Sequence, residues 1–349
     1  MRADHTTRRT GTLPTGTLPT GSTGTAAVAA RVPAAALGLS AGYLFDLIAG
    51  DPRRGHPVAA FGRAASAAER LLWRDHRGAG ALYTGVCAGG AVAAAAALER
   101  AVRRSPAART ALAAAATWSV VGGTSLAREA RTIAAALRAD DLGTARARLP
   151  HLCGRDPRDL DADGIARAVV ESVAENTSDA VVGALVWGAA CGVPGLAGFR
   201  AVNTLDAMVG HRSPRHRRFG WASARLDDAA GWPGARLTAL LAALAGPGPR
   251  GALRAWHTDA HRHPSPNAGV VEAAFAGALG VRLGGTLSYG GRVEHRPVLN
   301  AGGRPVRTAD IERAVRLSRR VSALALVVCA AAGTVREKWF DGRHGRGVR

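Results

Sequence analysis

Lysine is almost absent from this sequence. Lysine and arginine together number 46, yet the only lysine is Lys338, close to the C-terminus. A Walker A loop and a central Schiff-base lysine each need a lysine side chain, so the sequence excludes both. Any phosphate that binds is therefore held by arginine, by backbone amides or by a metal ion.

Cysteine and aromatic residues are also scarce. The four cysteines include no CxxC pair, which supports neither a zinc knuckle nor a disulfide framework. Aromatic residues make up 5% of the chain, while the formal net charge is +20. The arginines are spread over nearly every polar segment, with no basic stripe beside aromatic residues, so we expect no nucleic-acid partner. Basic segments that flank membrane spans explain the charge more simply.

The chain does contain a series of uncharged segments rich in alanine and glycine. They cover residues 32–45, 78–98, 110–127, 180–199, 237–249 and 321–335. Only the segments 78–98 and 180–199 comfortably reach the roughly 20 residues that cross a bilayer, and the segment 110–127 is borderline. Strand signals are weak throughout, so we expect an all-α, polytopic integral membrane protein with several transmembrane or re-entrant helices and polar helical loops. A soluble alanine-rich helical protein remains the alternative.

The two ends of the chain differ in composition from its centre. Residues 1–31 contain the repeat TLPTGTLPTG and are predicted to be a disordered tail rich in threonine, glycine and proline. Residues 32–340 are predicted to form a single membrane-embedded domain, and residues 341–349 a basic C-terminal tail. Arg31 interrupts the first apolar stretch, so the sequence shows no clean signal peptide.

The segment ESVAENTSD, residues 171–179, places three acids at the edge of an uncharged segment. On a helix, Glu171, Glu175 and Asp179 fall within about 80° of one another, on one face. Like charges at this spacing repel unless arginine, a metal ion or a metal-bound phosphate lies over them. A solvated helix end whose acids favour the N-terminus is the open alternative.

Two further segments carry acids near apolar residues. In ARLDDAAGW, Asp227 and Asp228 are adjacent, so only one of them can share a helix face with Arg225 or with the acids of another segment. Pairing of Arg225 with Asp228 at a helix end is the structural alternative to metal binding. In AVNTLDAMVG, Asn203 and Asp206 lie on one helix face and could supply a metal or hydroxyl ligand.

Two polar loops complete the set of candidate site segments. In HPSPNAG, two prolines fix the backbone and leave Ser265 and Asn267 to present polar groups. In LGGTLSYGG, Gly284 and Gly285 could approach a phosphate, although the segment matches neither GxGxxG nor a P-loop. Three nearby histidines match no zinc site in other respects: His257, His261 and His263.

Taken in order, four segments resemble the signature blocks of the CobD/CbiB cobalamin-biosynthesis family, over about residues 36–330. They are GYLFDLIAGDPRRGHPV, ESVAENTSDAVV, AVNTLDAMVGHRSPRHRRFGWASARLDDAAGWPGARLTALL and HPSPNAGVVEAAFAGALGVRLGGTLSYGGRVE. The resemblance implies an adenosylcobinamide-phosphate synthase, a multi-pass enzyme of the inner (cytoplasmic) membrane. Such an enzyme joins (R)-1-amino-2-propanol or its O-phosphate to a propionate carboxylate of adenosylcobyric acid in an ATP-dependent amide synthesis. Adenosylcobinamide or its phosphate is the product.

The resemblance also suggests roles for the candidate residues. We interpret five acids as Mg²⁺ ligands: Glu171, Asp179, Asp206, Asp227 and Asp228. Substrate or nucleotide binding is expected of Asp51, Asn176, Asn203, Ser265, Asn267, Gly284 and Gly285. Glu175 or His56 would take the proton from the amine, and Arg225 would neutralise the transferred phosphoryl group. ATP and Mg²⁺ are expected as substrate and activator, with no permanently bound cofactor.

The topology of residues 180–199 decides whether these segments can meet. If the segment crossed the membrane once, the acids before and after it would lie on opposite sides. The break at Gly192-Val193-Pro194-Gly195 predicts instead a re-entrant hairpin that enters and leaves on one face. ATP places that face in the cytoplasm, and the expected partners are membrane lipid and other enzymes of the corrinoid pathway. A transporter or a non-catalytic scaffold of that pathway is the alternative, although no internal repeat supports a transporter.

Overall fold

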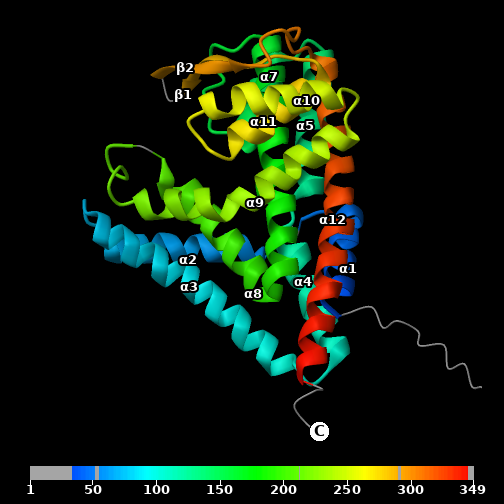
Figure 1. Cartoon of the computed structure of the whole chain (residues 1–349). Coiled ribbons are helices and arrows are strands. Elements are labelled where there is room, and N and C mark those ends of the chain that lie inside the picture. Colours follow the sequence, from blue (N-terminus) through cyan, green and yellow to red (C-terminus); the bar gives the residue numbers. More distant parts are fainter. Residues whose placement is uncertain (1–33, 52–54, 212, 290–291, 345–349) are drawn as a thin grey trace, which may run out of the picture. The chain divides into compact units, whose positions relative to one another are not determined.

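Helices dominate the computed structural model, which describes residues 34–51, 55–211, 213–289 and 292–344 (Figure 1). The predicted tail at 1–31 lies outside the described residues, as do residues 345–349 of the predicted C-terminal tail, and the domain limits stay a prediction. The helices are α1 (Ala34–Ala49), α2 (Pro57–Leu72), α3 (Arg77–Val102), α4 (Pro106–Val120), α5 (Gly123–Arg138), α6 (Leu142–Arg148), α7 (Ala162–Thr177), α8 (Gly183–Leu205), α9 (Trp221–Ala245), α10 (Pro249–Asp259), α11 (Ala268–Leu279) and α12 (Thr308–His344).

The expectation of an all-α chain needs one correction. Strands β1 (Leu283–Tyr289) and β2 (Arg292–Leu299) form an antiparallel hairpin, which contains the predicted glycine-rich loop. A register shift lies between Leu283 and Gly285, where Gly284 and Gly285 have positive φ angles of 79° and 90°. Glycine reaches this backbone conformation without steric cost, so the paired glycines permit an irregular strand that the weak strand signals did not predict.

Local sequence signals set several helix ends. The Asp161 side chain accepts a hydrogen bond from the Gly164 amide and caps α7. The Ser105 hydroxyl accepts one from the Ala108 amide at the start of α4, where Pro106 occupies the first turn. Aspartate and serine side chains accept hydrogen bonds from the free amides of a first helical turn, and proline has no amide hydrogen to satisfy there. At the other end, Gly280 adopts a left-handed conformation and terminates α11.

Two helical segments are long and apolar enough to cross a membrane. They are α3 and the continuous stretch Ala162–Gly210, which agrees with the two longest predicted runs. The borderline run at 110–127 does not form one helix, because the chain leaves helical geometry between α4 and α5. Within its most apolar window, α3 is 22% buried inside the protein, whereas Ala162–Gly210 is 67% buried. Length and composition alone therefore single out α3 as the apolar helix with the least protein around it.

Helix α8 doubles back on itself at the predicted break. Gly192 has φ 67° and ψ −148°, which is not helical and is open essentially only to glycine. In a straight helix, Gly183 and Phe199 would lie about 24 Å apart. A Cβ atom on Gly183 would nevertheless clash with the ring of Phe199, and one on Gly195 with the carbonyl of Trp187. The two halves of α8 therefore pack against each other, so the chain reverses at the predicted break, and entry and exit on one membrane face stay a prediction.

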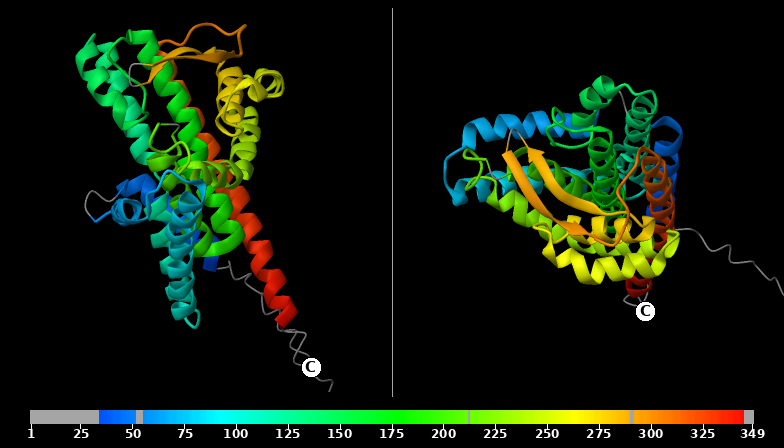
Figure 2. Two further views of the ribbon diagram at one scale, coloured as in Figure 1. Left: turned by 90° about the vertical axis from the view of Figure 1, so that its left-hand side faces the viewer. Right: turned by 90° about the horizontal axis from the view of Figure 1, so that it is seen from above.

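The main hydrophobic core joins α5, α7, α8, α9, α11 and α12. Helix α12 runs along this core and contacts α1, α5, α7, α8 and α9 (Figures 1 and 2). The β1–β2 hairpin lies at one end of the helical bundle, next to α10 and α11 (Figure 2). This arrangement brings the segment before α11 close to α7 and α9, although the sequence separates them widely.

Large exposed apolar side chains gather on only some of the described helices. On α1, α3 and α12 they include Leu37, Leu44, Phe45, Leu47, Ile48, Leu82, Val86, Val92, Leu98, Leu324, Val327, Val328 and Val335. Helices α5, α6, α7 and α8 expose no large apolar side chain. Contiguous apolar surface of this kind typically contacts a membrane or another protein.

Candidate active site

The acids of α7 and of the turn that follows it share one face, as their spacing predicts. Glu175 interacts electrostatically with Glu171, and Asp179 interacts with Glu175. Glu171 is buried, and the other two side chains are only partly accessible. The helix begins at Ala162, well before these acids. The alternative of a solvated N-terminal helix end is therefore wrong, and the acids face the protein interior.

Glu171 joins three parts of the chain. Its Oε2 accepts a hydrogen bond of 2.5 Å from Arg155 Nη2, and its Oε1 accepts one of 2.7 Å from the Gly284 amide. Both charged side chains of the Arg155–Glu171 pair are almost completely buried. Because both oxygens already have partners, Glu171 fixes the loop before α7 and strand β1 to α7. These contacts give Glu171 a structural role that does not depend on a metal ion.

The α8 hairpin returns the chain to the α7 acids. Asp179 interacts electrostatically with Arg200, Asp206 and Asp227. Arg200 Nη1 lies 3.5 Å from Asn203 Oδ1, and Asn203 Nδ2 lies 3.5 Å from Asp227 Oδ1. π-Helical turns at Ser178–Val182 and Asp206–Gly210 flank α8 on both sides. Such turns are frequent at functional sites, and here each one carries an acid of the cluster.

Adjacent aspartates on α9 point in different directions, as their helical spacing requires. Asp227 faces the α7 and α8 acids, and its burial together with nearby Asp206 raises its pKa to about 7. Asp228 Oδ2 lies 3.7 Å from Arg225 Nη1, whose side chain is 69% exposed. The pairing of Arg225 with Asp228 that the sequence left open is therefore present. We call Glu175, Asp179, Asp206 and Asp227 the acidic cluster; Asp228 and Arg225 lie at its surface side.

Arginines from other segments lie near the acidic cluster, where the sequence suggested Arg225. Glu175 interacts electrostatically with Arg155 and Arg296, and Asp179 with Arg200. Arg155 comes from the loop before α7, Arg200 from α8 and Arg296 from β2. Sequence reasoning missed all three, because each is one of many arginines and only the tertiary fold brings them to the acids.

A second missed group lies between α11 and β2. Glu272 is buried, and burial together with Glu171 and Glu175 raises its pKa well above the usual value. His263 Nε2 lies 3.4 Å from Arg296 Nη1 and 4.0 Å from Glu272 Oε1. Burial and then Arg296 lower the pKa of His263, so the ring is neutral at pH 7. The signal for Glu272 was its position as the single charge in an apolar segment, VVEAAF.

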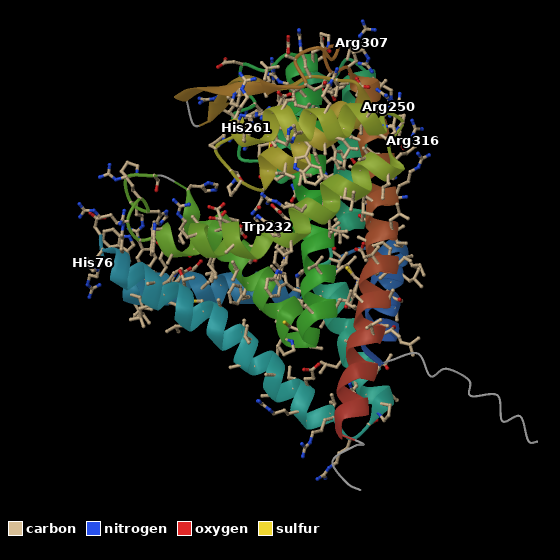
Figure 3. All side chains as sticks on the ribbon, in the orientation of Figure 1. His76, Trp232, Arg250, His261, Arg307 and Arg316 are labelled. Atoms are coloured by element: carbon tan, nitrogen blue, oxygen red, sulfur yellow. The ribbon has the colours of Figure 1, made fainter. Side chains whose placement is uncertain are left out.

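The three histidines near α10 do not converge. His263 is buried, whereas His257 and His261 are exposed, with His261 at the surface in Figure 3. Their separation agrees with the sequence, which matched no zinc site at these positions.

The polar loop HPSPNAG ties α11 to α9. Asn267 Nδ2 donates to the Asp228 carbonyl at 2.8 Å, and Asn267 Oδ1 accepts from Arg236 Nη1 at 2.7 Å. The Ser265 hydroxyl accepts from the Asn267 and Ala268 amides at 3.3 and 3.1 Å. The loop polarity that suggested ligand binding is thus satisfied within the protein, and these side chains position the end of α9 that carries Asp227.

The remaining predicted residues lie in three places. His56 Nδ1 accepts from the Val58 amide at 3.2 Å and caps α2. Asp51 and Asn176 line a cavity of about 260 Å³, together with Arg200. Gly284 and Gly285 line another cavity of about 420 Å³ at the start of α7. Of these lining residues, Arg200 is the one that links the acidic cluster directly to a cavity.

The donor atoms of the acidic cluster fit Mg²⁺ in kind. Carboxylate and amide oxygens are the ligands that Mg²⁺ prefers, and it usually takes one or two carboxylates together with water and substrate phosphates. Among the described residues, no group of three or more His, Cys, Asp or Glu side chains is close enough to hold a metal ion alone. One or two of these carboxylates, with water or phosphate oxygens, would match the usual ligand set of Mg²⁺.

The fold and the site define a helical protein that combines outward-facing apolar helices with a buried site of carboxylates and arginines. A family profile described as "CobD/Cbib protein" matches residues 39–318, which is most of the chain. The chain belongs to this family, whose members act in cobalamin biosynthesis, and the resemblance read from the sequence is confirmed.

Curated relatives agree with the family profile. A protein of Mycobacterium tuberculosis named "Cobalamin biosynthesis protein CobD" is 55% identical over 298 residues, or 84% of this chain and 94% of the relative. Proteins of the same name from Rhodobacter capsulatus and Chromobacterium violaceum are 48% and 43% identical, over 59% and 82% of this chain and 66% and 93% of their own lengths. No solved structure is significantly similar.

Proposed function

We propose that this protein joins an amino alcohol, (R)-1-amino-2-propanol or its O-phosphate, to a propionate carboxylate of adenosylcobyric acid in an ATP-dependent reaction. The observation that carries the proposal is the convergence of the acidic cluster with Arg155, Arg200 and Arg296. Membership of a cobalamin-biosynthesis family supports the corrinoid as the acid substrate.

The reaction needs an activated carboxylate. In the proposed sequence, a carboxylate oxygen of the corrinoid takes the γ-phosphoryl group of ATP, which gives an acyl phosphate and ADP. The amine nitrogen then attacks the acyl carbon, loses a proton, and inorganic phosphate leaves. Both steps pass through highly anionic transition states, so the enzyme must supply positive charge at fixed positions.

The residues of the cluster divide this work. One or two of the carboxylates of Asp179, Asp206 and Asp227, together with water and phosphate oxygens, would hold Mg²⁺, which neutralises phosphate charge when bound. Arg155, Arg200 and Arg296 provide the fixed positive charge, which the sequence had ascribed to Arg225. A guanidinium group can pair with two phosphate oxygens at once.

Glu175 is the proposed acceptor of the amine proton. It is partly accessible and lies between the acids of α7 and the guanidinium groups of Arg155 and Arg296. His56, the other candidate, uses Nδ1 to cap α2, and this contact fixes the ring at the start of that helix. A proton acceptor must reach the reacting nitrogen, so the position among the acids favours Glu175.

We propose that the protein lies in the cytoplasmic membrane with several membrane-embedded helices, and that the acidic cluster faces the cytoplasm, where ATP is available. The exposed apolar side chains of α1, α3 and α12 and the low burial of α3 support this location. The returning α8 hairpin lets the acids of α7 and α9 meet on one side of the membrane. Lipid and other enzymes of the corrinoid pathway are the proposed partners.

A direct assay tests the proposal. Membranes that contain the protein, given ATP, Mg²⁺, adenosylcobyric acid and either amine, are expected to yield the amide together with ADP. Omission of ATP, of Mg²⁺ or of the amine provides the controls. Absence of amide with both amines, in membranes shown to contain folded protein, contradicts the proposed function.

A further inference from the structure

A polar cavity lies beside the acidic cluster and is distinct from it. Its volume is about 260 Å³, and its lining comes from five parts of the chain, including Asp51, Ser125, Glu129, Asn176 and Arg200. Sites for drug-sized ligands usually measure about 300–1,000 Å³, so this cavity suits a small molecule.

Two charged side chains in the wall have unmet hydrogen-bonding capacity. Oδ1 of Asp51 and Nε of Arg200 are buried and have no hydrogen-bond partner among the described residues. A buried polar atom without a partner costs about 1–3 kcal/mol, so native proteins rarely retain one without a reason. The two side chains also interact electrostatically. Because both residues line the cavity, its wall contains one carboxylate and one guanidinium group.

Glu129 and Asn176, two other polar residues of the wall, already have hydrogen-bond partners. Glu129 accepts from Arg148 Nε and Nη2 at 2.7 and 2.5 Å, and its Oε1 lies 3.4 Å from His151 Nδ1. Asn176 Nδ2 donates to the Ser172 carbonyl at 2.9 Å. Asp51 and Arg200 are consequently the charged groups of the wall that are best placed to select a ligand.

The start of α5 adds to the cationic side of the cavity. Gly122 is the N-cap of this helix and forms no side-chain capping bond, and both Gly122 and Ser125 line the cavity. The Thr124 amide is already bound to Asp46 Oδ2 at 3.1 Å. The helix dipole and the other free amides of the first turn of α5 favour an anion, as does the positive charge of Arg200.

We propose that this cavity binds the amine substrate as a zwitterion, with its ammonium group at Asp51 and its phosphate at Arg200. This inference rests on the proposed function. Of the two amines, only the phosphate ester carries both charges, and the free amino alcohol has no anionic group to place at Arg200. Arg200 also interacts with Asp179, so the bound amine would lie next to the acidic cluster where the acyl group is activated.

Binding to the full-length protein in lipid nanodiscs, without ATP or corrinoid, tests this assignment. Calorimetric titrations would compare aminopropanol phosphate, aminopropanol and inorganic phosphate. We expect the ester to bind at least about tenfold more tightly than aminopropanol, since each charged hydrogen bond adds to affinity. Arg200→Gln should weaken ester binding by at least about tenfold and change aminopropanol binding little, whereas Asp51→Asn should weaken both.

Matched variants separate binding from folding. Arg138→Gln and Asp140→Asn alter exposed charges at the far end of α5 and should leave all affinities unchanged. Arg200→Lys keeps the charge beside Asp179 and should retain more ester affinity than Arg200→Gln. Ser125→Leu narrows the cavity with no change of charge and should weaken both amines. Equal binding of the two amines to the parent protein, or unchanged ester binding in both Arg200→Gln and Ser125→Leu, overturns the assignment.

The amide assay distinguishes this inference from the proposed function. If the amide forms but the Arg200 and Ser125 variants keep the parent KM for the amine, the cavity is wrong and the function stands. If no amide forms with either amine although the ester binds with the expected pattern, the function is wrong and the cavity stands.

Discussion

Helix α3 and the α8 hairpin are built from nearly the same residues, mainly alanine, glycine and valine, yet they differ in structure. Helix α3 is unbroken and exposes Leu82, Val86 and Leu98. The α8 hairpin reverses at Gly192, is largely buried, and carries Arg200 and Asn203 toward the acids. Apolar composition therefore does not decide where the chemistry lies. The position of the candidate site depends instead on the backbone break and on the polar residues at the open end of the hairpin.

A comparison of two arginine–glutamate pairs should give the largest effect on stability. Glu171→Gln removes the carboxylate that is hydrogen-bonded to the buried guanidinium of Arg155, and loss of one partner of a buried pair costs about 3–5 kcal/mol. The exposed pair Arg131–Glu312, with side chains 40% and 35% exposed, provides the control. Glu312→Gln should cost less than about 1 kcal/mol. Thermal unfolding of the purified variants measures both, and equal losses would show that the site is not a rigid interior.

The hairpin itself can be tested at its turn. Gly192→Ala forces a side chain into a backbone conformation that costs about 1–3 kcal/mol, so folded protein and amide synthesis should fall together. Gly90→Ala in α3 is the matched control, because its Cβ atom would meet nothing within 4 Å. If Gly192→Ala behaves like Gly90→Ala in thermal unfolding and in turnover, α8 does not need its break.

The effect of pH on Mg²⁺ activation should be smaller than these effects on stability, and it should report on one residue, Asp227. Asp227 has a pKa of about 7, raised by burial and by Asp206, so it is protonated below that pH and ionised above it. A metal ligand must be ionised, so the apparent affinity for Mg²⁺ should fall about tenfold between pH 8 and pH 6. Kinetic titration with Mg²⁺ at each pH measures this. A pH-independent activation constant would remove Asp227 from the metal site.

Features that depend on local spacing could be predicted from the sequence. The shared face of Glu175 and Asp179 follows from the helical repeat, and the break at Gly192 from the GVPG sequence. The same reasoning showed that Asp227 and Asp228 must diverge. In each case the deciding residues lie within a few positions of one another, so helix geometry alone fixes the outcome.

Features that depend on distant segments could not be predicted. Arg155 and Arg296 reach the site only because distant segments pack together, and no local pattern marks them. Glu272 stands out as the single charge in VVEAAF, but only the fold shows that it lies near Glu171 and Glu175. The sequence predicted a binding role for Asn267, and the fold shows that its side chain is hydrogen-bonded to Arg236 and to a backbone carbonyl. A polar loop indicates that hydrogen bonds form, but only the fold shows whether their partner is a ligand.

The most direct test of the central claim compares two neighbouring residues on α9. Asp227→Asn keeps shape and folded protein levels but removes a charge from the acidic cluster, and turnover should fall at least about tenfold, a cautious value for lost transition-state stabilisation. Glu175→Gln should also keep normal levels of folded protein and lower turnover at least about tenfold. Asp228→Asn removes the same charge one residue away, beside exposed Arg225, and should leave turnover within about threefold of the parent. Equal turnover in the two aspartate variants, at normal membrane levels, would contradict a catalytic acidic cluster.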